Sequence, residues 1–395
     1  MFELEEVATQ EVDMNSTVIK VVGVGGAGGN AVDHMIREGV SGVEFICCNT
    51  DAQALKKSSA HVKLQLGPGL GAGGKPEKAR ELAVLDRERI ADALRGAHMV
   101  FITAGMGGGT GTGAGPVVAE VARDLGILTV AVVTKPFEYE GRRKRLAEEG
   151  VTELAKHVDS LIVILNEKLE EVLGEEISYL EAFKTADNVL RNAVGGIAEI
   201  INVPGLVNVD FEDVRTVMGE MGKAMMGSAV AAGVDRARIA AEGAVASPLL
   251  EGIELSGARG VLVNITASST LGLREYKEVM KTIRTYTAPE ATVICGTVFD
   301  EGMEDQLRVT VVATGLGLAA SREGAKPKMT VVEPFMRGTG TDGMPVYETG
   351  AVAGIDLSSV ASGRGTALRN PQAQAMVDSG VDKYDIPAFL RRQSD

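Results

Sequence analysis

Apolar segments of two kinds alternate along the first half of the chain. The first kind is a short run of β-branched and other apolar residues without polar alternation, at Val18–Val22, Val43–Cys48, Met99–Thr103, Leu128–Val133 and Leu161–Leu165. The second kind has helical spacing and lies between these runs, at about Asn30–Glu38, Pro76–Leu94, Pro116–Leu125 and Leu146–His157. Wholly apolar strands that alternate with helices indicate a parallel sheet covered on both faces. The first half is therefore predicted to be a doubly wound α/β domain.

A long helical stretch begins at Ser178. Ser178 and Glu181 have the spacing of a capping box. Apolar residues then recur three, four or seven positions apart as far as Ile201, and Pro204 ends the stretch. About 25 residues at a rise of 1.5 Å give a helix of about 35–40 Å, which is long enough to connect two domains.

The second half predicts a smaller α+β domain. Another helix is expected over Phe211–Met225, with Val214, Met218, Met221 and Met225 on its core face. Three strand candidates follow: Val261–Thr266, Thr292–Val298 and Arg308–Thr314. A helix near Leu273–Tyr286 separates the first two. The last two are close enough in sequence to pair as an antiparallel hairpin.

Composition narrows the choice of function. The 54 acidic residues exceed the 40 basic ones, and the resulting net charge of −14 argues against a dedicated nucleic-acid binder. The apolar fraction of 45% supports a sizeable core, and no run approaches the length of about 18 apolar residues that a membrane span needs. The acidic start of the chain lacks the regions of a signal peptide. Cys47, Cys48 and Cys295 have no metal-ligand spacing and suggest buried thiols in a reduced, cytosolic protein.

The 49 glycines are bunched into loops at predicted strand and helix ends. The first loop, Gly23–Asn30, follows a strand, precedes a helix and has the GxGxxG spacing of a dinucleotide fingerprint. The second, Gly107–Gly113, combines glycines with two threonines and lacks the lysine of a Walker A loop. The third, Gly67–Gly74, precedes the helix at Pro76. Because glycines let backbone N–H groups approach a phosphate at a helix N-terminus, three such loops suggest a polyphosphate enclosed from several sides.

Three other interpretations stay open on these residues alone. A tight turn without a ligand explains the first loop. An NAD(P) oxidoreductase also fits the first loop, with Asn49 and Asp51 where a Rossmann protein holds its ribose. The second loop and the lack of an evident His or Tyr hydride-site partner argue against that enzyme. A nucleotide-gated scaffold that binds without turnover is the non-enzymatic alternative.

The sequence GGGTGTG at Gly107–Gly113 has the form of the tubulin-type GTPase signature. With the first loop, the segment Asn208–Asp213 (NVDFED) and the tail Asp385–Arg392, it makes the chain resemble the tubulin/FtsZ family of GTPases. The resemblance runs from about Val18 to Gly317 and resumes near Asp385. It implies GTP and GDP as ligands with Mg²⁺, hydrolysis of GTP, and self-assembly into head-to-tail filaments during bacterial cell division.

The resemblance assigns the phosphates and the metal ion to loop residues. The phosphate loops are Gly26, Ala27, Gly28, Gly29 and Asn30, and Gly107, Gly108, Gly109, Thr110, Gly111, Thr112 and Gly113. The loops near the phosphates and Mg²⁺ supply Asn49, Asp51, Ala72 and Gly73. Asp51 is the metal candidate, either directly or through water.

The resemblance assigns the nucleoside to the later part of the first half. Glu140 would hold the ribose, Asn166 would contact the guanine or ribose edge, Phe183 would stack on the base and Asp187 would pair with guanine N–H groups. Phe183 and Asp187 are four residues apart and share a helix face; a core phenylalanine beside a solvated charge is the alternative. The segment after Glu140 is one residue shorter than the family pattern, and Arg143 is favoured over Lys144 as the basic contact.

Asp210 and Asp213 are the catalytic candidates. Their spacing places both carboxylates on one side of a helix start, although charge complementarity at a helix N-terminus explains acidic residues there equally well. The resemblance implies that this loop completes a neighbouring subunit's site, where both aspartates polarise the attacking water and Asn208 contacts the nucleotide.

Six parts of the chain follow from these arguments. They are an N-terminal arm (1–16), a GTP-binding domain (17–177), a central helix (178–203), a C-terminal α+β domain with the catalytic loop (204–317), a flexible linker (318–380) and a partner-binding tail (381–395). The linker is expected because periodicity disappears and Gly, Pro, Ser and Thr make up roughly a third of it. The resemblance implies that Asp385–Arg392 binds membrane-tethering division adaptors in the cytoplasm, at the midcell division site. No direct membrane insertion is expected, and the net charge predicts no nucleic-acid binding.

Overall fold

A computed structural model describes residues 17–173, 178–202, 209–220, 222–247 and 257–316. The N-terminal arm, the linker and the tail, together with Asn208, lie outside the described residues. The first half contains six strands: β1 (Ile19–Val24), β2 (Val43–Asn49), β3 (Val62–Gln65), β4 (Met99–Gly105), β5 (Leu128–Lys135) and β6 (Ser160–Leu165). Five of them match the predicted apolar runs within two residues at either end.

The strands form one ten-stranded sheet in the order β3-β2-β1-β4-β5-β6-β7-β10-β8-β9. All neighbours from β3 to β7 are parallel. The strand order reverses direction along the sheet beside β1, which is the arrangement of a doubly wound fold. The predicted α/β class of the first half is confirmed.

Helices cover both faces of the parallel strands. The face that includes Val21 and Phe101 packs against α1 (Gly25–Arg37) and α8 (Tyr179–Asn202). The opposite face, which includes Val22 and Ile102, packs against the helices α3 (Pro76–Leu85), α4 (Arg87–Leu94), α5 (Thr110–Asp124) and α6 (Arg142–Leu154). Adjacent residues of one strand thus enter different cores, which explains why the strands are apolar throughout.

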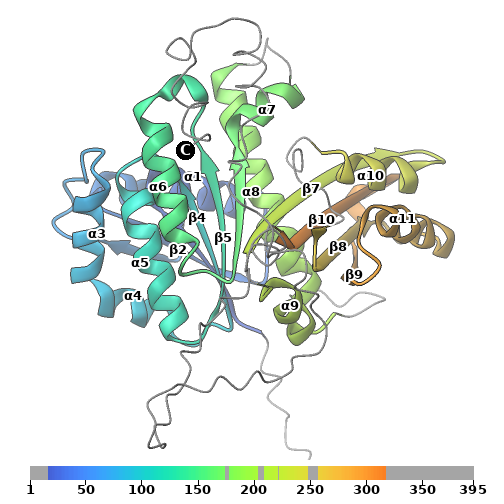
Figure 1. Ribbon diagram of the computed structural model, residues 1–395, viewed down its shortest axis with the longest axis horizontal. Coiled ribbons are helices and arrows are strands. Elements are labelled where there is room, and N and C mark those ends of the chain that lie inside the picture. Colours follow the sequence, from blue (N-terminus) through green and yellow to red (C-terminus); the bar gives the residue numbers. More distant parts are fainter. Residues whose placement is uncertain (1–16, 174–177, 203–208, 221, 248–256, 317–395) are drawn as a thin grey trace, which may run out of the picture. The chain divides into compact units, whose positions relative to one another are not determined.

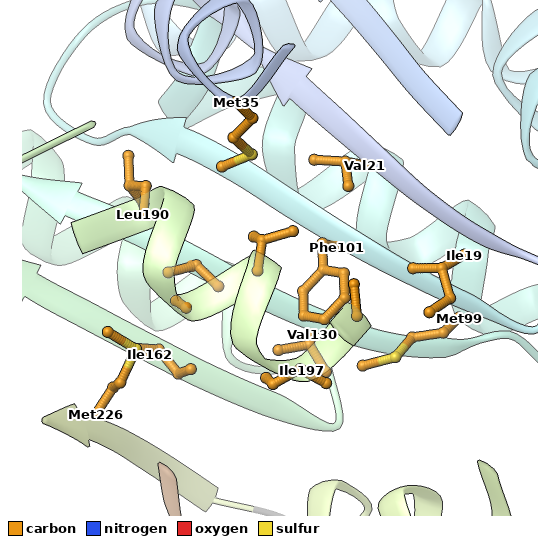
Figure 2. Close-up of a cluster of buried hydrophobic side chains, with 14 of the residues drawn as sticks. Ile19, Val21, Met35, Met99, Phe101, Val130, Ile162, Leu190, Ile197 and Met226 are labelled. Atoms are coloured by element: carbon orange, nitrogen blue, oxygen red, sulfur yellow. The ribbon is translucent and has the colours of Figure 1, made fainter. Parts of the chain in front are cut away.

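The first core joins the two halves of the chain. Figure 2 shows Phe101, Met35 and Ile197 converging between the sheet, α1 and α8, with Met226 of β7 at the same cluster. In Figure 1, α8 lies between the parallel strands and the strands of the second half. The predicted central helix is confirmed, and Ser178 caps it by accepting a hydrogen bond from the Glu181 backbone N–H at 3.3 Å.

Two glycine-rich segments are helical where loops were expected. The helix predicted at Asn30 begins at Gly25, and the helix predicted at Pro116 begins at Thr110. The predicted helix Pro76–Leu94 is also broken at Asp86, whose Oδ2 accepts the Gly67 N–H at 2.8 Å. The short elements α2 (Ala52–Lys57) and β3 were not predicted.

The second half differs from its prediction in three respects. The helix expected over Phe211–Met225 ends at Met218 as α9 (Phe211–Met218), and Met225 belongs to the unpredicted strand β7 (Gly222–Ala232). The expected hairpin is wrong, because β10 (Gln306–Leu316) pairs antiparallel with β7 and β8 (Gly260–Ala267), and β9 (Thr292–Phe299) pairs parallel with β8. A parallel pair needs a long crossover, which α11 (Leu273–Tyr286) provides. The helix α10 (Arg236–Val245) was not predicted.

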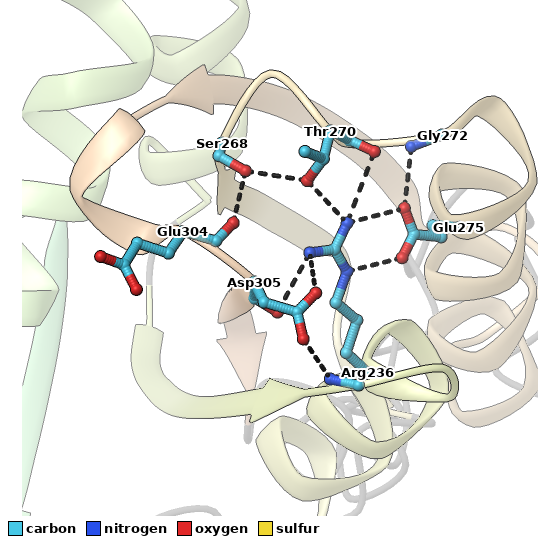
Figure 3. Close-up of polar contacts among 8 residues, drawn as sticks. Arg236, Ser268, Thr270, Gly272, Glu275, Glu304 and Asp305 are labelled. Carbon is cyan, nitrogen blue, oxygen red and sulfur yellow. Dashed lines mark hydrogen bonds and ion pairs between the residues drawn. The ribbon is translucent and has the colours of Figure 1, made fainter.

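Arg236 connects separate elements of the second half by polar contacts. Its side chain is only 5% exposed and forms an ion pair with Glu275 of α11, with Nε to Oε1 at 2.6 Å. It also donates to the Asp305 carbonyl at 3.1 Å and to Thr270 Oγ1 at 3.2 Å. Figure 3 shows these partners on two stretches of the chain, one with Thr270 and Glu275 and the other with Asp305, around one guanidinium group.

All three cysteines are buried and unpaired, as predicted. No helix within the described ranges is both long and apolar enough to cross a membrane.

We predict that Arg236→Ala lowers the free energy of unfolding by about 2–3 kcal/mol, because it removes a buried side chain and leaves the partly buried Glu275 without its ion-pair partner. Arg238→Ala is the control: its pair with Glu242 is exposed and is expected to contribute less than about 1 kcal/mol. Chemical denaturation of both variants measures the difference. Equal losses would show that the Arg236 network does not stabilise the second half.

Candidate nucleotide-binding site

Two helix N-termini meet at the carboxyl edge of the parallel sheet. The strands β1 and β4 are neighbours. The helix α1 begins at Gly25, directly after β1, and α5 begins at Thr110, after a four-residue loop that follows β4. Neither helix has an acidic residue in its first turn. Free backbone N–H groups and the positive ends of two helix dipoles therefore converge on one place, which favours a bound anion.

Glycine lets these two helix starts approach each other. Gly25 has a φ of +78°, and a Cβ built on it would lie 2.9 Å from the Gly111 backbone nitrogen. A side chain at this position would be strained and would push the second loop away. The structure thus brings the first two glycine loops together, as the polyphosphate interpretation requires.

The third loop closes over the second. Gly71 N–H donates to the Thr50 carbonyl at 2.8 Å, and Ala52 N–H donates to the Gly69 carbonyl at 3.0 Å. A Cβ on Gly109 would lie 3.0 Å from the Cβ of Ala72. The loop that carries Ala72 and Gly73 therefore lies against the second phosphate loop.

The two threonines of the second loop have different surroundings. Thr112 is buried, and its Oγ1 accepts the Gly107 N–H at 2.9 Å, which shapes the loop. Thr110 Oγ1 lies 2.7 Å from Oγ1 of the buried Thr50. Thr50 was not among the predicted residues. Its position between the two predicted residues Asn49 and Asp51 is the sequence signal that could have identified it.

A cavity of about 290 Å³ opens between α1, the end of β2 and α2. The Asp51 carboxylate caps α2 by accepting the Gln53 N–H at 2.8 Å, and Asn49 Oδ1 accepts the Asp51 N–H at 3.1 Å. The predicted residues that line the cavity are Gly26, Gly29, Asn30, Asn49 and Asp51. Within the described ranges, no three His, Cys, Asp or Glu side chains are grouped as metal ligands.

Glu140 lies in a short 3₁₀ turn, η1 (Glu138–Glu140), at the start of α6. One carboxylate oxygen accepts the Phe137 N–H at 3.1 Å, and the other pairs with Arg143. Lys144 instead pairs with Glu138. The structure thus joins Arg143, and not Lys144, to the predicted ribose residue.

The base end of the site combines a buried amide with aromatic rings. Asn166, the first residue of α7 (Asn166–Leu173), is buried, and its Oδ1 has no hydrogen-bond partner among the described residues. Phe183 is 38% exposed and meets the Phe137 ring edge-to-face at 6.1 Å. Phe137 stacks on Tyr139 at 5.3 Å. Sequence reasoning missed Phe137 and Tyr139, although aromatic residues beside Glu140 are noticeable in a chain with only 4% of them.

Asp187 is half-buried on α8, one turn after Phe183. Burial raises the pKa of its carboxyl to about 6, while the nearby His34 and Arg37 of α1 act in the opposite direction. His34 Nε2 lies 2.7 Å from Asn188 Oδ1, which joins α1 to α8 at this level. A partly buried carboxylate suits a ligand that donates N–H groups to it.

The two catalytic candidates lie at the opposite edge of the sheet. Asp210 caps α9 by accepting the Asp213 backbone N–H at 2.8 Å, and both side chains are exposed. The intervening Phe211 packs on His98, which directly precedes β4. Figure 1 shows α9 at the bottom of the view and α7, which follows β6, at the top. A seven-residue strand such as β4 separates these edges by about 20 Å.

The residues predicted around the nucleotide are therefore brought to one edge, and Asp210 and Asp213 are not among them. The fold and its three loops define a nucleotide-binding α/β protein that holds phosphates on helix N-termini. Two family models match the chain: the Tubulin/FtsZ family GTPase domain over residues 18–174 and the FtsZ family C-terminal domain over residues 222–317.

Relatives and solved structures agree with these matches. Proteins named Cell division protein FtsZ from Pseudomonas putida and Pseudomonas aeruginosa are 53% identical over the full length of both chains. An empty FtsZ dimer from M. jannaschii has a TM-score of 0.73 at 44% identity, covering 77% of this chain and 89% of that one. A GTPgS-bound protofilament of CetZ2 from Haloferax volcanii, 20% identical, shares the fold with a TM-score of 0.66 over 78% of this chain and 98% of that one.

The chain belongs to the Tubulin/FtsZ family and carries its GTPase domain. Its ligand is accordingly a guanine nucleotide, and the oxidoreductase interpretation is wrong.

We predict that GTP affinity falls as the pH decreases through about 6. A protonated Asp187 cannot accept two guanine N–H groups, so the loss should approach tenfold per pH unit below this pKa. Titration of binding with a fluorescent guanine nucleotide measures it. In Asp187→Asn this pH dependence should be absent; the same dependence in both proteins would contradict a role for Asp187.

Proposed function

We propose that this chain is a cell-division GTPase that assembles head to tail and hydrolyses GTP between subunits. One observation carries the proposal: the phosphate loops and the Asp210–Asp213 pair occupy opposite edges of one sheet. Among the described residues, the carboxyl edge holds the glycine loops, and the amino edge holds Asp210 and Asp213. Stacking one copy on the next joins the two edges and completes the site.

The nucleotide is held in an extended arrangement along the carboxyl edge. Backbone N–H groups of Gly26–Asn30 and Gly107–Gly113 bind the phosphates, and Ala72 and Gly73 adjoin the terminal one. The Glu140–Arg143 pair faces the ribose. Asn166 Oδ1, which is buried without a partner among the described residues, accepts a hydrogen bond from the nucleoside. Phe183 stacks on the base, and the Asp187 carboxylate accepts hydrogen bonds from the N–H groups of the base.

Magnesium fits the phosphate end of the site. Mg²⁺ is commonly held by one carboxylate together with phosphate oxygens and water. Asp51 is one of two carboxylates, with Asp33, that line the cavity beside the first loop. It would hold the ion directly or through water, and the ion would neutralise phosphate charge.

Catalysis relies on positioning. Asp210 and Asp213, with Asn208 ahead of them, would meet the γ-phosphate of the neighbouring subunit's nucleotide and orient the attacking water. The carboxylates are exposed and point from the first turn of α9, so they are available to a second copy.

We predict that Asp213→Ala binds GTP normally as a monomer but lowers turnover about 100-fold or more. Asp213 contributes only its backbone N–H to the cap, so its side chain can be removed without uncapping α9. Glu212→Ala, an exposed acid in the same turn, is the matched control and should retain activity. Phosphate release and nucleotide binding measure the two properties.

Wild-type turnover should also rise more steeply than linearly around an assembly threshold. Specific activity that remains constant down to monomeric protein would rule out a shared site.

The C-terminal segments extend the proposal to the membrane. The linker 318–380 supplies reach, and the apolar and basic tail Asp385–Arg392 binds membrane-tethering division adaptors, which holds filaments in the cytoplasm at midcell. Ile386, Pro387, Phe389 and Leu390 support this role, because apolar residues in a polar segment are unfavourable in water unless a partner covers them.

We predict that removing Asp385–Asp395 leaves GTP hydrolysis and assembly intact and abolishes recruitment to adaptor-coated vesicles. Phe389→Ser in the full chain is the matched point variant and should lose most of the recruitment. Co-sedimentation with vesicles measures it. Undiminished recruitment of the truncated protein would mean that another segment binds the adaptor, and loss of GTPase activity would place the tail in the folded core.

A further inference from the structure

The start of α9 carries the two catalytic candidates, Asp210 and Asp213, and the rest of this helix packs into the core. Val214, Val217 and Met218 are fully buried in the cluster that includes strands β8 and β1. Phe211 is only partly buried, and it stands between Asp210 and Asp213 in the sequence. The contacts of this one ring therefore help to decide where the carboxylates point.

Phe211 is held from two sides. The His98 ring meets it edge-to-face at 6.1 Å and 67°. The guanidinium group of Arg215, on the next turn of α9, lies 5.8 Å from its centroid. His98 belongs to the loop before β4, so this contact links α9 to the nucleotide-binding half of the chain.

His98 is itself fixed to the amino edge of the sheet. Its backbone N–H donates to the Val18 carbonyl at 2.9 Å, and its carbonyl accepts the Leu128 N–H at 3.2 Å. Its ring Nδ1 accepts the Val18 N–H at 3.0 Å. These bonds fix His98 at the starts of β1, β4 and β5, beside Phe211.

We propose that His98 is a positioning residue for GTP hydrolysis: its ring, through Phe211, fixes the first turn of α9 and so aims Asp210 and Asp213 at the neighbouring subunit's nucleotide. This inference rests on the proposed function, because it assigns no contact between His98 and the nucleotide. It gives a residue at the amino edge of the sheet an indirect part in the reaction, although no sequence motif includes this residue.

A positioning role of His98 and a role in stabilising the fold predict different results when this residue is replaced. His98 is exposed, so its replacement leaves no cavity in the core, and its effect on the melting temperature should be small. A displaced carboxylate, in contrast, lowers the rate strongly, because small changes in the position of a reacting group are costly.

Two replacements distinguish the ring from its hydrogen bond. His98→Asn retains an oxygen acceptor near the position of Nδ1 and loses the ring, and His98→Phe retains a ring and loses the acceptor. We expect His98→Asn to lower kcat about tenfold with unchanged GTP affinity of the monomer. His98→Phe should retain most of the wild-type kcat. Phosphate release at saturating GTP, nucleotide binding and melting temperature are measured for both, with Asp213→Ala alongside.

An unchanged kcat in His98→Asn would overturn the inference, and so would equal losses in the two His98 variants. If Asp213→Ala abolishes turnover in the same experiment, either result refutes the His98 role alone. If Asp213→Ala hydrolyses GTP normally, the proposed function fails and the inference fails with it.

Discussion

The two edges of a parallel sheet differ, because every strand begins at one edge and ends at the other. In this chain the carboxyl edge collects the helix starts at Gly25 and Thr110, whose free N–H groups suit phosphates. The amino edge collects His98 and the first turn of α9 with its carboxylates. The rest of the account depends on this polarity, since the sheet itself keeps the two sets of residues apart within one copy of the chain.

The helix α8 connects the two edges. Its first turns carry Phe183 and Asp187 at the base end of the nucleotide site, and it ends at Asn202, eight residues before Asp210. Its 24 residues span about 36 Å at 1.5 Å each. Because α8 packs against both the parallel strands and the second-half strands, it gives the base end and the catalytic end of one subunit a common rigid support.

Much of this arrangement could be predicted from the sequence, and the failures have physical causes. Apolar runs identified five of the first six strands, and the one-face spacing of Phe183 and Asp187 was correct for α8. The starts of α1 and α5 were missed because glycine disfavours helices. At these positions glycine instead lets the backbone N–H groups of the first turn approach a ligand. The strand β7 is rich in Ala, Gly and Met and has little intrinsic strand preference; pairing with β6 and β10 makes it a strand. Phe137 and Tyr139 join the base end only through tertiary contacts.

A complementation assay tests the division of the site most directly. Asp187→Ala impairs the nucleotide edge and keeps the carboxylates, whereas Asp213→Ala keeps the nucleotide edge and impairs the carboxylates. If one copy supplies the cradle and its neighbour the carboxylates, mixed filaments contain interfaces with both intact edges, and an equimolar mixture should hydrolyse GTP well above the sum of the separate activities. A mixture no more active than that sum would contradict the account and place the complete site within a single chain.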